Sequence, residues 1–210
     1  NSTPQFMPAS VPVRPICLLD AEGALQPGAE PLLDDDEVLE ALRYMVYGRA
    51  FDAKSFSLQR QGRLGTFAPL VGQEAAIMGA AMATDPKRDW LVPQYRETPA
   101  LIRHGHLAER VALYRIGHPD GGIIDTDVKV MQFQISLAAQ IPHAVGLGWG
   151  MQMQGEDGVA VAFFGEGSSS EGDFHEAANL AGVMKAPIIF FLQNNQWAIS
   201  TPREIQSASV

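Results

Sequence analysis

Glu166 and Asn195 are the residues of this sequence whose types and spacing best fit a chemical role. Glu166 lies between two glycines, Gly165 and Gly167, and Asn195 follows 29 residues later. Carboxylate and amide oxygens suit Mg²⁺, which takes few protein oxygens and completes its octahedron with water and substrate phosphates. The neighbouring glycines let a phosphate approach the backbone closely. Together these residues predict a site for a diphosphate with a divalent metal.

Two apolar runs and the segment between them must position these residues. Residues 159–164 and 187–192 are predicted to be buried strands, and residues 168–184 a helix that crosses from one to the other. Strands joined by such a crossover are parallel, so both end at the same carboxyl edge of the sheet. Ligands of open α/β sheets bind at that edge. Glu166 and Asn195 are therefore expected to converge there.

The remaining segments predict an α/β fold, a parallel sheet flanked by helices. Residues 1–33 are proline-rich and lack periodicity, so we expect an extended arm ahead of one α/β domain over residues 34–210. The acidic residues 34–37 are expected to cap the first helix. Patterning places helices over 34–59, 72–82, 101–114 and 138–153, and a short buried strand over 90–92.

Composition narrows the class of function. The 210 residues carry a formal net charge of −9, which argues against a general nucleic-acid binder. The single cysteine, Cys17, cannot form an internal disulfide and suits a reducing compartment. No run reaches the roughly 18 consecutive apolar residues of a membrane-spanning helix. We therefore expect neither nucleic acid nor a membrane among the partners.

Tyr95 and Arg96 follow the short strand over 90–92 and are predicted to form a phosphate clamp. An arginine supplies fixed, planar donors that match phosphate oxygens. If this strand belongs to the same sheet, Arg96 should point into the same cleft as Glu166 and Asn195.

These motifs, in this order, resemble one family. The Gly-Glu-Gly run and the Asn-Asn pair are similar to the thiamine diphosphate motif, which begins Gly-Asp-Gly and ends Asn-Asn about 30 residues later. Residues 60–76 (RQGRLGTFAPLVGQEAA) and 93–97 (PQYRE) match separately. From about residue 32 onward, the chain resembles the alpha subunit of the decarboxylating component of 2-oxo acid dehydrogenase complexes. Glu166 replaces the usual aspartate, as it does in branched-chain members.

The resemblance implies a thiamine-diphosphate-binding fold and a set of binding residues. The implied cofactor contacts are Tyr95, Arg96, Ile135, Leu137, Gly165, Glu166, Gly167, Ser168, Asn195, Trp197, Ala198 and Ile199. The implied Mg²⁺ ligands are Glu166, Asn195 and the main-chain carbonyl of Trp197. The implied substrate contacts are Phe67 and Gln94.

The family's activity is the oxidative decarboxylation of a 2-oxo acid, with acyl transfer to the lipoyl group of an acyltransferase component. Two alpha and two beta subunits assemble in this family, and the proton-transfer groups come from the beta subunit and from a histidine in the later half of the alpha subunit. Family members continue well over a hundred residues further, so we expect this chain to be the amino-terminal part of a longer subunit. The implied location is the cytoplasm of a bacterium, or the mitochondrial matrix of a eukaryote.

The resemblance leaves more than one substrate and more than one activity open. QRQGRLG and the spacing between Gly117 and Pro142 favour pyruvate, whereas Glu166 and the run Gln94–Glu97 favour a branched-chain 2-oxo acid. An acetoin dehydrogenase has a closely similar alpha subunit. The non-enzyme alternative is a structural subunit with a vestigial diphosphate site.

Three local expectations concern packing rather than chemistry. Ser168 and Glu171 have the spacing of a capping box for the crossover helix. The glycines at 146, 148 and 150 are expected to allow tight packing against another helix. The five histidines lack metal-ligand spacing. His104 and His106 are expected to be structural, and His175 is expected to be a surface or packing residue.

Overall fold

The structure, a computed structural model, describes residues 16–207. The chain divides into two compact units, Asn1–Val38 and Leu39–Val210. The expected arm falls in the first unit, and its residues 1–15 lie outside the described residues. Its described part contains an antiparallel bridge between Leu19 and Leu25. No described helix is long and apolar enough to cross a membrane.

The first helix begins with reciprocal capping. The Glu37 amide donates to Asp34 Oδ1, and the Asp34 amide donates to Glu37 Oε2, both at 2.9 Å. Two amide groups that have no helical partner are thereby satisfied, as the acidic run predicted.

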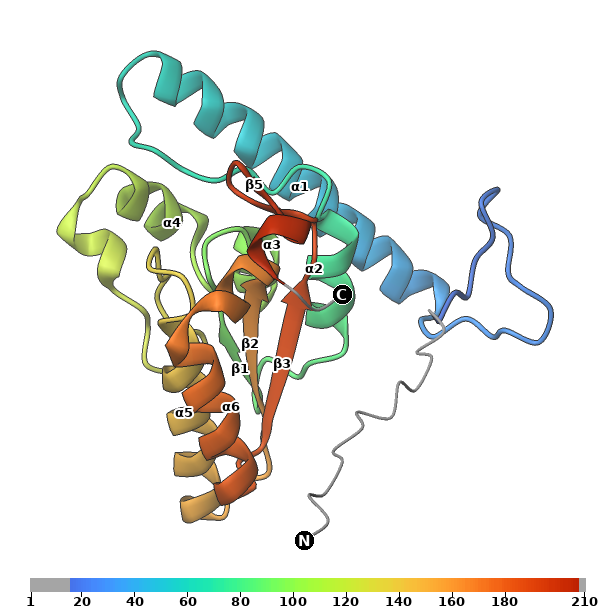
Figure 1. Cartoon of the computed structure of the whole chain (residues 1–210). Coiled ribbons are helices and arrows are strands. Elements are labelled where there is room, and N and C mark those ends of the chain that lie inside the picture. Colours follow the sequence, from blue (N-terminus) through green and yellow to red (C-terminus); the bar gives the residue numbers. More distant parts are fainter. Residues whose placement is uncertain (1–15, 208–210) are drawn as a thin grey trace, which may run out of the picture. The chain divides into compact units, whose positions relative to one another are not determined.

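The described residues form the following elements, labelled in Figure 1 where there is room: α1 Asp35–Arg60, α2 Glu74–Met82, β1 Trp90–Val92, α3 Thr98–Arg103, α4 Ala108–Arg115, the 3-10 turn η1 Pro119–Gly122, α5 Gln140–Gln154, β2 Ala160–Gly165, the 3-10 turn η2 Glu166–Ser170, α6 Gly172–Met184, β3 Ile188–Gln193, β4 Trp197–Ala198, β5 Thr201–Pro202 and α7 Arg203–Gln206.

A parallel three-stranded sheet in the order β1–β2–β3 is the centre of the second unit. Trp90 pairs with Ala160, and Ala160 pairs in turn with Ile188. The register ends with Gly165 opposite Gln193, so the segments of Glu166 and Asn195 leave the sheet at the same edge. The predicted parallel crossover from β2 through α6 to β3 is confirmed. A separate antiparallel hairpin, β4–β5, follows β3.

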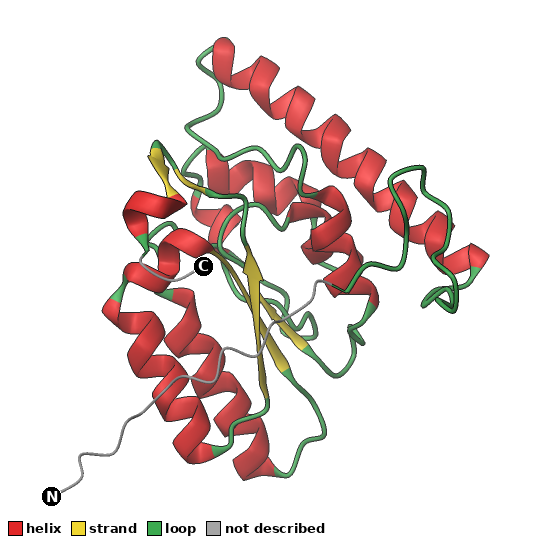
Figure 2. Cartoon of the chain, turned by 45° about the vertical axis from the view of Figure 1, so that its right-hand side comes forward, coloured by secondary structure: helices red, strands yellow, loops and turns green. Residues whose placement is uncertain are grey.

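The two faces of the sheet pack against different helices because side chains alternate along each strand. Leu91, Val161 and Phe163 pack in one cluster with apolar residues of α2, α3 and α4. Phe164 lies on the other face, in a cluster with apolar residues of α5 and α6. Figure 2, coloured by secondary structure, shows the strands between these two helical layers. The central strand β2 is thus buried on both sides, as its continuous apolar run requires. The prediction of a buried strand over residues 187–192 is wrong: β3 lies at the edge of the described sheet, and Ile189 and Leu192 are 48% and 46% exposed.

The helix predicted over residues 101–114 is two helices. Gly105 adopts a φ of +99°, which ends α3, and α4 begins at Ala108. Leu107 precedes α4 and is 47% exposed. The apolar spacing continued across the break, so it did not reveal the turn.

The crossover helix begins later than predicted. Residues 166–170 form η2, and α6 starts at Gly172 with Glu171 as its N-cap. The predicted capping box is wrong, because no side chain caps α6. The Glu171 amide instead donates to the Ser168 carbonyl at 3.1 Å.

The glycines of α5 do not share one packing role. A Cβ on Gly148 would lie 2.8 Å from the Pro187 carbonyl oxygen, so the close neighbour is the segment before β3 rather than a helix. A Cβ on Gly146 or Gly150 would meet nothing within 4 Å. The expectation of helix packing is therefore wrong for these three positions in this chain.

Candidate functional site

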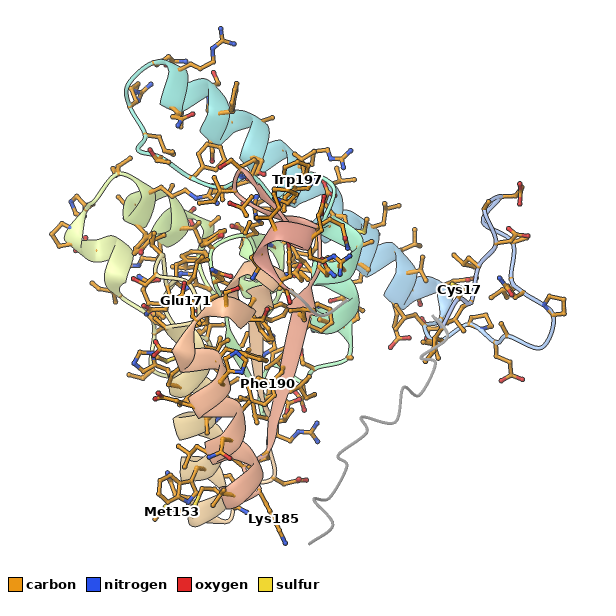
Figure 3. All side chains as sticks on the ribbon, viewed as in Figure 1. Cys17, Met153, Glu171, Lys185, Phe190 and Trp197 are labelled. Carbon is orange, nitrogen blue, oxygen red and sulfur yellow. The ribbon has the colours of Figure 1, made fainter. Side chains whose placement is uncertain are left out.

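The segments that follow the three strand ends surround a cavity of about 60 Å³. All of the predicted cofactor contacts except Ile135 line it, and so does the predicted substrate contact Gln94. Figure 3 shows Trp197 at this end of the sheet and Met153 and Lys185 at the opposite end. The predicted convergence of Glu166, Asn195 and Arg96 in one cleft is confirmed.

Glu166 is held where β2 ends and is 5% exposed. Its Oε2 accepts a hydrogen bond from the main-chain amide of Asn195 at 3.3 Å. Its Oε1 is buried and has no hydrogen-bond partner. A buried carboxylate oxygen without a partner is costly, and a bound cation would satisfy it.

Asn195 is fixed by its own turn. Its Oδ1 accepts the Trp197 amide at 3.0 Å, which orients the side-chain amide and leaves the second lone pair of Oδ1 available. Within residues 16–207, no group of three or more histidines, cysteines, aspartates and glutamates could hold a metal. The predicted ligand set contains one carboxylate, one amide and one main-chain carbonyl, which is the mixed oxygen chemistry that Mg²⁺ accepts.

Gly167, which follows Glu166, has little spare room. A Cβ on Gly167 would lie 2.9 Å from the Cβ of Ala198 in the β4–β5 hairpin. Ser168 is buried, and its hydroxyl has no partner. The backbone amides of such a turn and an unpaired hydroxyl are donors suited to a phosphate.

Arg96 and Tyr95 line the same cavity. The Arg96 guanidinium stacks on the Tyr95 ring, 5.4 Å from its centroid, and Nη1 donates to the Pro69 carbonyl. The other guanidinium donors stay available for an anion. Burial raises the pKa of Tyr95, so its hydroxyl stays protonated at neutral pH.

A second, more apolar cavity of about 650 Å³ adjoins the first, and the two share Tyr95, Arg96, Leu137 and Ile199. The predicted contacts Ile135 and Phe67 line this second cavity. The two cavities together offer a polar end and an apolar end, as an amphipathic ligand with a diphosphate requires.

Arg115 secures the Phe67 side of the second cavity. Its guanidinium lies 5.2 Å from the Phe51 ring centroid and 4.7 Å from that of Phe67. It donates to Ser55 Oγ at 3.1 Å and lies 3.9 Å from Asp52. Burial raises the pKa of Asp52 despite the nearby arginine. Because its donors are directed at protein groups, Arg115 serves to hold Phe67 rather than to bind a ligand.

Strained backbone borders both cavities. Ala138, Gln196 and Ile199 have positive φ values of 65°, 73° and 58°. This conformation is a clear outlier for a β-branched residue such as Ile199, which is 92% exposed. Such residues concentrate at binding sites, where the strain helps to preorganise the site.

Sequence reasoning missed three residues that line the first cavity: Gln73, Glu97 and Gln193. Gln73 precedes α2, Glu97 follows the Tyr95–Arg96 pair, and Gln193 ends β3. The available signal was position: Glu97 and Gln193 lie within two residues of Arg96 and Asn195, and Gln73 lies in the matched segment 60–76.

The histidines behave as expected. His104 is buried and its Nε2 lies 3.0 Å from the Asp89 carbonyl oxygen. His106 is also buried. His175 is exposed, with Nε2 2.9 Å from the Ser169 carbonyl oxygen. Burial lowers the pKa values of both His104 and His106.

The chain is similar to one family model and to several known proteins. Residues 42–210 match the family model described as dehydrogenase E1 component. The pyruvate dehydrogenase E1 component subunit alpha of Bacillus cereus is 44% identical over 181 residues, which is 86% of this chain and 48% of that protein. The subunit of the same name from Bacillus subtilis is also 44% identical over 181 residues. The one from Staphylococcus epidermidis is 39% identical over 193 residues, 91% of this chain and 52% of that protein. The chain thus spans about half the length of the curated relatives it matches.

Proposed function

This chain belongs to the dehydrogenase E1 component family, and we propose that it forms part of the alpha subunit of a thiamine-diphosphate-dependent pyruvate dehydrogenase. The enzyme would decarboxylate pyruvate oxidatively and transfer the acyl group to the lipoyl group of an acyltransferase component. The observation that carries the proposal is the convergence of Glu166, Asn195 and Arg96 on one cavity from three different strand ends.

We assign the polar cavity to the diphosphate and Mg²⁺. Glu166 Oε1, Asn195 Oδ1 and the Trp197 carbonyl would hold the metal, and the unpartnered state of Glu166 Oε1 supports that role. Arg96 would donate to diphosphate oxygens from the segment after β1, and the Ser168 hydroxyl would donate from η2. The carboxylate charge of Glu166 would offset the charge of the ion, which the diphosphate also balances.

We assign the apolar cavity to the ring end of the cofactor and to the substrate. Ile135 and Leu137 would contact the aminopyrimidine ring, and Phe67 and Gln94 would border the 2-oxo acid. When bound, the cofactor supplies the carbanion chemistry that decarboxylation requires. The residues of this chain bind and orient the reactants and keep water from them. A beta subunit, in an assembly of two alpha and two beta subunits, would complete the site.

The test uses the full-length alpha subunit with its beta subunit. Calorimetric titration with thiamine diphosphate should show binding that depends on Mg²⁺, and Glu166→Ala should abolish that dependence while the unfolding midpoint of the unloaded protein changes little. An unchanged cofactor affinity in Glu166→Ala would contradict the metal assignment. A panel of pyruvate, 2-oxoisovalerate and acetoin should then show the highest kcat/KM for pyruvate, and a preference for either other substrate would redirect the assignment.

A further inference from the structure

Glu97 is an unusual buried acid next to the candidate site. It is 1% exposed, lines the polar cavity and directly follows the Tyr95–Arg96 pair. Among the described residues, no arginine, lysine or histidine forms an ion pair with it. Burial raises the pKa of its carboxyl, so the carboxylate is kept at a cost that the fold must offset elsewhere.

Hydrogen bonds from two separate segments offset that cost. The main-chain amides of Gln94 and Arg96 both donate to Glu97 Oε2, at 3.1 and 2.9 Å. These two amides bracket Tyr95, so one oxygen fixes the backbone on both sides of the clamp. The side-chain Nε2 of Gln193 donates to the other oxygen, Oε1, at 2.8 Å.

Gln193 makes this a link between the two halves of the site. It is the last residue of β3 and lies two positions before Asn195. A second hydrogen bond connects this group to β2, because the main-chain amide of Gly165, the last residue of β2, donates to Gln94 Oε1 at 3.3 Å. The strand ends that carry Arg96, Glu166 and Asn195 are therefore joined through Glu97 and its neighbours.

We propose that Glu97 is a positioning residue, whose carboxylate sets the Tyr95–Arg96 clamp at a fixed distance from the metal-binding segments. The proposal rests on the proposed function, because the clamp is assigned to the diphosphate. Glu97 itself need not touch the ligand, since three donors already occupy its two oxygens. Its action passes through Arg96 on one side and Gln193 on the other.

The proposal is tested in the full-length alpha subunit with its beta subunit, by the affinity for thiamine diphosphate in the presence of Mg²⁺. Glu97→Ala should weaken binding about 10- to 100-fold, the usual effect of removing a group that orients a ligand-binding residue. Glu97→Gln should stay close to wild type, because Gln193 can turn its side-chain amide and present Oε1, which has no partner. The exchange Glu97→Gln with Gln193→Glu keeps every donor and acceptor matched and should also bind the cofactor like the wild type.

Two further measurements separate positioning from a general loss of structure. Arg96→Lys and Glu97→Ala should be non-additive in a double-mutant cycle, because both act on the same contact. Asp89→Asn is the matched control: Asp89 is a buried acid ahead of β1, at the other end of the strand. It should lower the unfolding midpoint without changing cofactor affinity.

Distinct results overturn the two ideas. If the wild type does not bind the cofactor, the proposed function is wrong. If the wild type binds and Glu97→Ala binds equally well, or its effect adds fully to that of Arg96→Lys, the role of Glu97 is wrong. If Glu97→Ala does not fold, the exchange variant decides: a folded exchange variant that binds poorly overturns the proposal.

Discussion

Replacing Gly167 with alanine should weaken cofactor binding, and replacing Ala198 with glycine should restore it. The added Cβ would lie 2.9 Å from the Ala198 Cβ, whereas ordinary contact begins at 3.4 Å. The β4–β5 hairpin would therefore have to move away from η2 by at least about 0.5 Å. Because the hairpin carries Trp197 and Ile199, the movement would displace one wall of both cavities.

Two hydrogen bonds to Glu166 hold the segments on either side of the hairpin in place. Gln206 donates through Nε2 to the Glu166 carbonyl at 3.1 Å, and the Asn195 amide donates to Glu166 Oε2 at 3.3 Å. A shift of this size would lengthen both bonds. Inserting one methyl group into a packed contact costs about 1–3 kcal/mol. If that cost falls on the bound state, affinity drops about 5- to 150-fold.

The assay is calorimetric titration of the full-length alpha–beta protein with thiamine diphosphate and Mg²⁺. Gly167→Ala should bind more weakly, and the double variant with Ala198→Gly should bind like Ala198→Gly alone, because the nearest remaining atom, the Ala198 Cα, is 3.7 Å away. Gly172→Ala is the control, since its Cβ would meet nothing within 4 Å. Wild-type affinity in Gly167→Ala, or no rescue in the double variant, would refute the steric argument.

Four other changes have distinct expected outcomes. Gly148→Ala should lower the free energy of unfolding, because the overpacking cost of about 1–3 kcal/mol against Pro187 exceeds the gain in helix propensity of about 0.5–1 kcal/mol. Gly146→Ala should raise that free energy by the propensity gain alone, and denaturant unfolding that shows equal stabilisation by both would contradict the packing. Arg96→Lys should weaken cofactor binding by roughly 10- to 150-fold in calorimetry, because lysine keeps the charge and loses planar donors worth about 1.5–3 kcal/mol; an unchanged affinity would exclude the clamp. Burial lowers the pKa of His104, so the unfolded state takes up a proton first as pH falls below about 6.5 and stability is lost at up to about 1.4 kcal/mol per pH unit. Unfolding measured between pH 7 and 5 should show a shallower loss in His104→Gln, and an unchanged slope would assign the effect to other groups.

The sequence was most informative where an apolar run ended at a residue that favours turns. The apolar runs around residues 160 and 190, ended by glycine and asparagine, located β2, β3 and the convergence of Glu166 with Asn195. The fold class followed from that one crossover, because a helix that connects two parallel strands of a sheet is compatible with only a few topologies.

Other features depend on tertiary structure, and the local sequence does not indicate them. The bend at Gly105 was hidden because apolar residues recur at helical spacing on both sides of it. The role of Glu97 depends on Gln193, which lies 96 residues away in the sequence. Nothing in the composition of the hairpin indicates that Ile199 takes a left-handed conformation, since the intrinsic preference of isoleucine opposes it.

The register of the sheet also has a consequence for the order of folding. Trp90 of β1 pairs with a residue 70 positions later, whereas Ala160 of β2 pairs with one 28 positions later. Loop-closure entropy disfavours the longer connection by about 0.8 kcal/mol, and slower closure goes with longer separation. We therefore expect β2, α6 and β3 to associate first, with Glu166 and Asn195 already facing each other before Arg96 arrives. Pulse-labelling hydrogen exchange should show amides of β2 and β3 protected ahead of those of β1, and the reverse order would contradict this sequence of events.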